Sequence, residues 1–180
     1  EALASIAAVS HMELTSNTGQ GAHSIVCEYG KLGAVKDAGG SKGTLVRIQE
    51  LFSNVPARLK FFKSESAEST KIKNTLKALA MANFAVSFRV RNKGALLHYW
   101  PACESKRERV LQVLEQEQMF LGEGECDGVG AQVLLCSPNV TTRRSHQIWL
   151  FAQDRWIQDR SLQAALMDAY RGLLMHGEYP

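Results

Sequence analysis

The sequence predicts an α+β fold in which helices and antiparallel strands are mixed rather than arranged in regular βαβ repeats. Three observations support this prediction. Residues 44–49 and 84–91 alternate between two kinds of side chain, as strands with one buried face do. Residues 66–83, between them, repeat apolar side chains at helical spacing. Asn92-Lys93-Gly94 then turns the chain, so that residues 95–100 return as the second strand of a hairpin.

The elements of the first half follow from spacing and from chain-breaking residues. A helix is expected at the start, because Leu3, Ile6, Ala7 and Ser10 share one helical face. Strands are expected around 12–14, 25–27 and 44–49, with glycine-containing loops between them. The last of these strands places Thr44, Val46 and Ile48 on one face, and Asn54-Val55-Pro56 breaks the segment after it, because proline cannot donate to a ladder.

The second half predicts a helix at 106–117, strands at 131–136 and 148–152, and a final helix after Asp159. Asp159 is a suitable N-cap because its carboxylate can accept from the first free amides of the helix. The acidic, glycine-rich segment 122–130 is expected to be a flexible turn. Its Glu and Asp spacing lacks the final glutamate that a calcium loop needs, so calcium binding is not expected.

The composition indicates an ordinary globular protein. The 180 residues are 45% hydrophobic and 22% charged. No apolar run approaches the ~20 residues of a transmembrane helix, so no membrane partner is expected. The four cysteines form no C-x-x-C pair, and we expect free thiols. No histidine has metal-ligand spacing and no serine lies in a nucleophile elbow, so the sequence predicts neither a metal site nor a catalytic residue.

Lysine and arginine occur in short clusters, although the net charge is only +3. One cluster is Lys106, Arg107 and Arg109, and another is Arg143 and Arg144. Such clusters could bind nucleic-acid phosphates through salt-sensitive contacts that do not depend on base sequence. For any single cluster a solvated surface is the simpler interpretation, because nearby acidic residues offset several of them.

Two segments carry a resemblance to a known family. They are Glu1-Ala2-Leu3-Ala4-Ser5-Ile6 and the stretch 43–61, GTLVRIQELFSNVPARLKF. The chain resembles DNA mismatch repair proteins of the MutL/Mlh/Pms family, which belong to the GHKL ATPases. In that family a "GFRGEAL-S-I" phosphate-binding loop precedes a "GT-V-V-LF-N-PAR-KF" segment, and the two motifs occur here in the same order.

A third segment, residues 153–160, is similar to the family's "VNGR-V-D" strand, turn and helix. Gln153-Asp154 stands here where the family has Asn-Gly. The resemblance implies a groove for DNA lined by basic residues of this region. The implied DNA-binding residues are Arg143, Arg144, Arg155 and Arg160. The alternative is that Arg155 and Arg160 only pair with the neighbouring acids, Asp154 and Asp159.

The resemblance implies an architecture of two parts. Residues 1–102 are expected to form the C-terminal half of a GHKL-type ATPase α/β sandwich. Residues 103–180 are expected to form part of a transducer domain that resembles domain 2 of ribosomal protein S5. Pro101-Ala102 marks the expected boundary between them.

The resemblance also assigns a nucleotide role to several residues. Thr44 is expected beside the adenine of ATP, and the segment Glu1, Ala2 and Leu3 is expected to end the phosphate-binding loop, whose backbone amides suit an anion. A turn near the nucleotide lid is expected to be held by Asn54, Pro56 and Arg58.

The implied function is that of a weak, Mg²⁺-dependent ATPase acting as an ATP-gated clamp, which couples mismatch recognition to strand incision. The implied partners are DNA, a MutS-type mismatch sensor and a second copy of the full-length protein, in the cytoplasm of a bacterium and associated with its nucleoid. The 180 residues are expected to be an internal fragment without the family's catalytic glutamate and Mg²⁺-binding asparagine. We therefore expect the fragment alone to be inactive and to carry no bound ATP or Mg²⁺.

Two alternatives stay open at the level of sequence. One is an S5-like nucleic-acid-binding module without an ATPase role, which a preference for RNA would favour. The other is a different GHKL ATPase, such as a topoisomerase subunit. The segment Asn54-Val55-Pro56-Ala57-Arg58 argues against the second alternative, because gyrase-like proteins carry a different sequence after their Gly-Thr strand.

Overall fold

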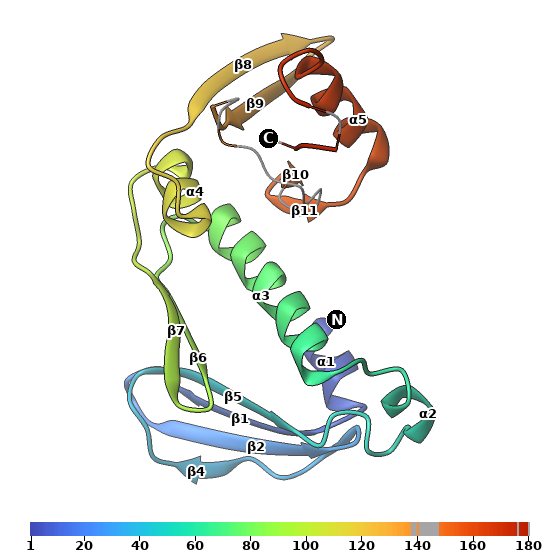
Figure 1. The fold of residues 1–180 in the computed structure, drawn as a ribbon. Helices are drawn as coiled ribbons and strands as arrows, with labels where there is room; N and C mark the ends of the chain where they lie inside the picture. Colours follow the sequence, from blue (N-terminus) through green and yellow to red (C-terminus); the bar gives the residue numbers. More distant parts are fainter. Residues whose placement is uncertain (138–139, 141–147, 176, 180) are drawn as a thin grey trace. The chain divides into compact units, whose positions relative to one another are not determined.

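The computed structural model describes residues 1–137, 140, 148–175 and 177–179. The chain divides into two compact units, which we call unit 1 (1–68) and unit 2 (69–180), and each is described by itself (Figure 1). Among the described residues, no helix has both the length and the apolar character needed to cross a membrane.

Unit 1 is an antiparallel sheet with a short helix at one end. Its strands run in the order β3-β2-β1-β5, and β4 also pairs with β2. Among the described residues, β5 is therefore an edge strand that pairs with β1 alone. The elements are α1 (Ala2–Ala7), β1 (His11–Asn17), β2 (Ala22–Glu28), β3 (Lys31–Leu32), β4 (Lys36–Ala38), β5 (Gly43–Gln49) and α2 (Pro56–Leu59).

The best-buried side chains of unit 1 lie on its two central strands. Met12 and Cys27 face each other across β1 and β2, and each is only 5% exposed. The Cys27 thiol lies 3.9 Å from the carbonyl of Ala7, which places α1 over this end of the sheet. The predicted face of Thr44, Val46 and Ile48 is in register with Ser16, Leu14 and Met12, respectively.

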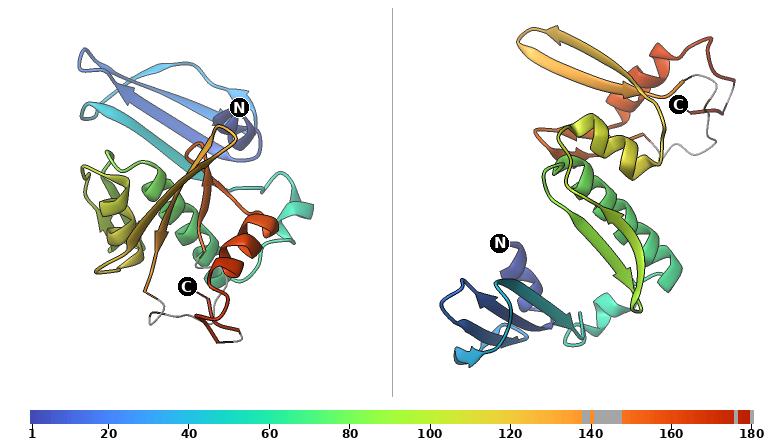
Figure 2. Two further views of the ribbon diagram at one scale, coloured as in Figure 1. Left: turned by 90° about the horizontal axis from the view of Figure 1, so that it is seen from above. Right: turned by 90° about the vertical axis from the view of Figure 1, so that its left-hand side faces the viewer.

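In its described residues, unit 2 combines helices with three separate two-stranded antiparallel hairpins. Figure 2 shows β8 and β9 side by side in both views, as their register requires. The elements are α3 (Glu65–Ala82, beginning in unit 1), β6 (Phe88–Asn92), β7 (Ala95–Trp100), α4 (Lys106–Leu114), β8 (Phe120–Cys126), β9 (Val129–Leu135), β10 (Leu150–Ala152), β11 (Arg155–Ile157) and α5 (Arg160–Ala169).

The core of unit 2 lies where α3, β7 and α4 meet. Ala80 and Met81 at the end of α3 pack with Trp100 of β7 and Val113 of α4, and all four are buried. Ser105 caps α4 by accepting from the amide of Glu108. Because this cluster joins three elements far apart in sequence, it fixes the centre of the unit.

Most predicted elements are present, but some details of the prediction were wrong. The strand predicted from residue 84 begins at Phe88, because residues 84–86 form a turn. The spacing of Ile72, Leu76, Leu79 and Ala80 predicts one buried face of α3, but Ile72 and Leu79 are 59% and 48% exposed. Ala80 is buried as predicted, together with Ala78 and Met81.

The acidic segment expected as a flexible turn is a regular hairpin. β8 and β9 pair over seven positions, from Phe120–Leu135 to Cys126–Val129. Asp127 and Gly128 form the tip, and both have positive φ. Asp-Gly is a preferred pair for such two-residue turns, so a usable signal was present in the sequence.

Candidate functional site

Thr44 lies near the start of the edge strand β5, with its side chain exposed. Its hydroxyl is 3.1 Å from the hydroxyl of Ser16, the residue opposite it on β1. His23 of β2 is opposite Ser16 in turn, so that three polar side chains cross this end of the sheet on one face. The row offers hydroxyl and imidazole groups to a polar ligand.

Ser16 was not predicted as part of this row. A signal for it existed, because Ser16 continues the alternation of Met12 and Leu14 along β1. Only the register between β1 and β5 shows that Ser16, rather than a neighbouring residue, contacts Thr44.

The residues expected to contact phosphates open α1. Glu1 is the N-cap of this six-residue helix and makes no side-chain cap bond, while Ala2 and Leu3 form its first turn, where Leu3 is 49% exposed. The first amides of a helix have no intrahelical acceptor and are suited to an anion. No hydrogen bond among the described residues joins Thr44 to these amides. Thr44 lies five positions along β5 from Gln49, the residue that pairs with His11 where the chain enters β1 after α1.

The turn after β5 fastens the end of α1. Asn54 Nδ2 donates to the Ala8 carbonyl at 3.2 Å, and the amide of Phe52 donates to the Val9 carbonyl at 2.7 Å. Pro56 occupies the first turn of α2, where proline loses no hydrogen bond. Arg58 stacks its guanidinium 5.4 Å from the centre of the Phe52 ring. All three residues predicted for this turn therefore have a structural contact in it or begin its helix.

A tyrosine just after β2 supports the same turn. The Tyr29 hydroxyl lies 2.5 Å from both the carboxylate of Glu50 and the hydroxyl of Ser53. The hydrogen bond to Glu50 raises the pKa of Tyr29 above its ordinary value. Tyr29, Glu50 and Phe52 all have positive φ, so the hydrogen bonds hold a backbone conformation that such residues rarely adopt.

Arg155 begins β11 and is exposed. The preceding turn, Gln153-Asp154, has positive φ at both residues, the geometry that Asn-Gly normally provides. Asp154 does not pair with Arg155, since its carboxylate accepts from Lys106 of α4 at 2.6 Å. Within the described part of the chain, Arg155 has no ion-pair partner.

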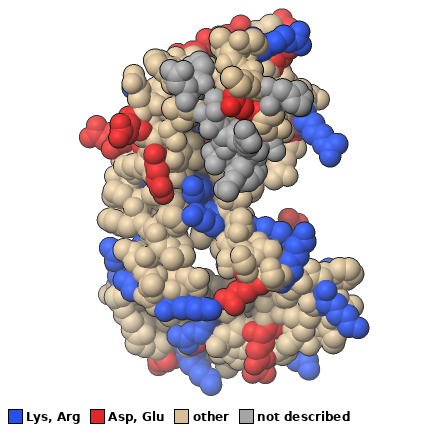
Figure 3. Space-filling model, viewed as in Figure 1, with Lys and Arg blue, Asp and Glu red and all other residues tan. Residues whose placement is uncertain are grey.

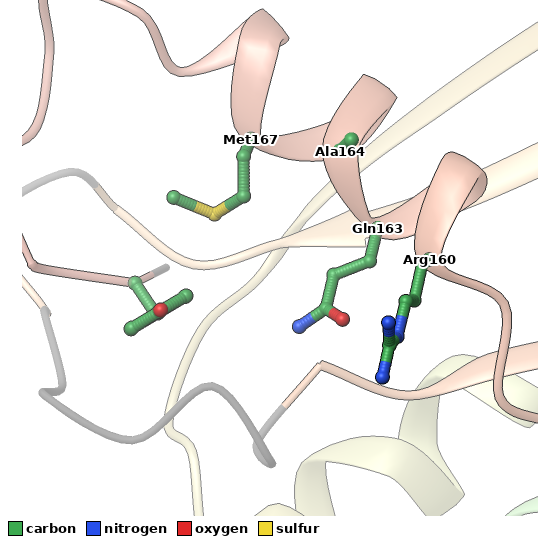
Figure 4. Close-up of a pocket in the computed structure, with 5 residues that line it drawn as sticks. Arg160, Gln163, Ala164 and Met167 are labelled. Carbon is green, nitrogen blue, oxygen red and sulfur yellow. The ribbon is translucent and has the colours of Figure 1, made fainter.

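Arg160 is the first residue of α5, and its expected alternative partner is also engaged elsewhere. Asp159 caps α5 by accepting from the amide of Leu162 at 2.8 Å, as predicted. Figure 4 shows Arg160, Gln163 and Met167 on one side of α5, where they line an open depression together with Ala164 and Tyr179. Arg160 has no ion pair among the described residues, and remains available to an anion.

Basic and acidic side chains are mixed on one face of the molecule (Figure 3). On the face drawn in Figure 3, lysine and arginine occur as separate small groups with acidic side chains among them. Arg143 and Arg144 lie outside the described residues.

In the parts of the chain that are described, no group of three His, Cys, Asp or Glu side chains could hold a metal ion.

Arg109 belongs to one of these clusters in sequence but is completely buried. Its Nη2 lies 2.8 Å from the carbonyl oxygens of Phe84, Val86 and Pro101, and Nη1 donates to the Ala80 carbonyl at 3.4 Å. Arg109 therefore cannot contact phosphates, and both interpretations of its cluster, a phosphate-binding surface and a solvated surface, are wrong at this position.

Comparison with known proteins explains this combination of elements. The family described as DNA mismatch repair protein, C-terminal domain, matches residues 109–180. The MutL protein of Syntrophus aciditrophicus is 35% identical over 185 residues, which cover all of this chain and 30% of that protein. The MutL protein of Syntrophobacter fumaroxidans is 32% identical over an equally long stretch.

The chain belongs to the MutL family of DNA mismatch repair proteins. Its fold is similar to the Aquifex aeolicus MutL ATPase domain complexed with ADP, with a TM-score of 0.79 and 27% identity over 93% of this chain and 66% of that one. A second structure of the Aquifex aeolicus domain gives a TM-score of 0.77 at 26% identity. The predicted fold, part of a GHKL ATPase followed by S5-like transducer sequence, is confirmed.

The chain spans about 30% of the length of the MutL proteins it matches. The segment matched by the C-terminal-domain family begins within α4, at Arg109. The MutL assignment therefore rests on the whole of this chain, while the activity of the longer proteins is a separate question.

Proposed function

We propose that this chain contributes one part of a nucleotide site and one part of a DNA-binding surface to a MutL-type, ATP-gated clamp. The clamp would couple recognition of a mismatch by a MutS-type protein to strand incision, and would dimerise when ATP and Mg²⁺ bind. It would act in the bacterial cytoplasm, at the nucleoid. The observation that carries the proposal is the likeness, at a TM-score of 0.79, to an ATPase domain that holds ADP.

The residues of unit 1 fit the nucleotide role. The exposed Thr44 hydroxyl and its partner Ser16 offer hydrogen bonds to a base or sugar, and the opening amides of α1 offer them to phosphate. Asn54 holds the end of α1 at Ala8, which would keep those amides in place. By the family resemblance, the Mg²⁺ ligand and the general base would come from residues of the longer protein outside this segment.

Calorimetric titration with a non-hydrolysable ATP analogue and Mg²⁺ tests this role. We expect the 180 residues alone to bind more weakly than micromolar and to show no hydrolysis. In a MutL-length protein that contains this segment, Thr44→Val should weaken binding about two- to tenfold, the effect of one hydrogen bond. Thr15→Val is the matched control, because Thr15 lies on the opposite face of β1. Equal effects of the two substitutions would contradict the assignment of Thr44.

The residues of unit 2 fit the DNA role. Arg155 and Arg160 are exposed and have no ion-pair partner in the described part of the chain. Fluorescence anisotropy with a labelled DNA duplex tests it, using the 180-residue chain and its Arg155→Gln/Arg160→Gln variant. The slope of log K against log salt should become shallower by about 0.9 for each phosphate that the variant no longer neutralises. Tighter binding to RNA than to DNA would instead favour an S5-like RNA-binding module.

A further inference from the structure

Lys106 and Asp154 form an ion pair that joins two elements of unit 2. Lys106 is the first residue of α4, and Asp154 is the second residue of the turn between β10 and β11. Their charged atoms are 2.6 Å apart, and the side chains are 53% and 61% exposed. An ion pair this open to solvent is weak and exchanges readily with other ions.

The backbone conformation at Asp154 does not itself require an acidic side chain. Asp154 has a φ of 62° and Gln153 a φ of 48°, a conformation that glycine and asparagine adopt most easily. An uncharged residue would therefore suit this turn as well as aspartate or better. Compared with those residues, aspartate adds a negative charge, and its carboxylate accepts a hydrogen bond from the Lys106 ammonium group.

The next residue along the chain is Arg155, which our proposed function assigns to DNA. Because Asp154 contacts Lys106, the turn carrying Arg155 lies against the start of α4. Lys106 is thus a cation beside the turn that leads into Arg155, and Asp154 is the acid paired with it. A phosphate oxygen can replace the Asp154 carboxylate on the Lys106 ammonium, since both are anionic oxygen acceptors.

We propose that Lys106 belongs to the DNA-phosphate-binding surface and that Asp154 is an internal competitor, which a DNA phosphate must displace from Lys106. This inference rests on the proposed DNA-binding function of Arg155. It predicts that Asp154 lowers DNA affinity through Lys106 specifically, and not only through its own charge.

The test is a double-mutant cycle on DNA binding by the 180-residue chain, measured by anisotropy with a labelled duplex over a range of salt concentrations. Asp154→Asn removes the charge and keeps a side chain that tolerates positive φ. It should raise the affinity about two- to fivefold, the effect of freeing one exposed ion-pair partner. It should also steepen the salt dependence by about 0.9, as expected when one more phosphate is neutralised.

Asp127→Asn is the matched control. Asp127 is also an aspartate with positive φ at a hairpin tip of unit 2, and the substitution makes the same change in net charge. No ion pair involves Asp127 within the described residues. Asp127→Asn should leave DNA affinity nearly unchanged, and the Asp154→Asn gain should shrink to that small effect when Lys106→Gln is also present.

The outcomes separate the two proposals. If Arg155→Gln/Arg160→Gln weakens binding but Asp154→Asn gains nothing, or gains equally in the Lys106→Gln background, Asp154 is not a competitor and only this inference fails. If the cycle shows coupling while the arginine variant binds as well as the unchanged chain, Lys106 stays on the surface and the assignment of Arg155 and Arg160 fails. Absence of DNA binding by the unchanged chain and by Asp154→Asn overturns both.

Discussion

Replacement of Arg109 by methionine should unfold unit 2 under conditions in which the unchanged chain is stable. Methionine keeps much of the length and apolar contact of the arginine stem but none of its hydrogen-bond donors. Four carbonyl oxygens that now accept from the guanidinium would lose a donor. They come from the end of α3, the turn after it and the end of β7, so that one side chain joins these segments to α4.

The size of the effect follows from burial. Arg109 is 0% exposed, and a buried polar group left without a partner costs about 1–3 kcal/mol. Some of the four carbonyls would gain water as the site relaxes, so the costs do not add fully. With four carbonyls at this cost each and incomplete additivity, we expect a net loss of about 3–5 kcal/mol. That is a large part of the ~5–15 kcal/mol that stabilises a typical domain.

Urea unfolding followed by tryptophan fluorescence measures this loss selectively. All three tryptophans, at positions 100, 149 and 156, lie in unit 2, and Trp100 is buried in its core. Arg155→Met is the matched control, because Arg155 is exposed and has no ion pair among the described residues; it should change stability by less than about 0.5 kcal/mol. If Arg109→Met were as mild as this control, the argument that the guanidinium fastens unit 2 would be refuted.

Two further predictions concern the same unit and the same fluorescence assay. Burial, together with the charges of Lys73 and Lys77, lowers the pKa of His98 below its ordinary value of 6.5. His98 therefore binds a proton more readily in the unfolded chain than in the folded one, so the free energy of unfolding should fall as the pH drops below about 6.5. His98→Gln should reduce that fall, and the same pH dependence in both proteins would contradict this prediction. Asp159→Ala removes the acceptor of the Leu162 amide and should destabilise α5 by about 1 kcal/mol. The urea concentration at the unfolding midpoint should fall accordingly, and an unchanged midpoint would show that the cap contributes nothing.

The elements that could be predicted from sequence are those fixed by local rules. The hairpin of β6 and β7 turns at Lys93-Gly94, where both residues have positive φ, and glycine makes that conformation inexpensive. Asp159 caps α5 at the residue where it was expected. In each case the decisive interaction joins residues that are close in sequence, so the pattern carries the information.

The parts that could not be predicted depend on contacts between distant residues. The strand predicted from residue 84 fails because the carbonyls of Phe84 and Val86 bond to Arg109 instead of a strand. The partner of Thr44 depends on the register between β1 and β5, which the pattern of either strand alone does not fix. The same holds for Lys106 and Asp154, which are 48 positions apart.

The comparison of Arg109 with Arg155 shows why counting basic residues does not locate a DNA-binding surface. Arg109 lies four residues before Val113 on α4, and both side chains are fully buried against the end of α3, so this stripe of the helix faces the core. Arg155 follows a tight turn on an exposed strand. The formal charge of +3 includes both, yet only the exposed one of the two, Arg155, is accessible to a phosphate, and Lys106 is paired with Asp154. On the proposed DNA-binding surface, the charge that a phosphate can reach therefore depends on which cations backbone carbonyls and acidic side chains already hold, and not on composition alone.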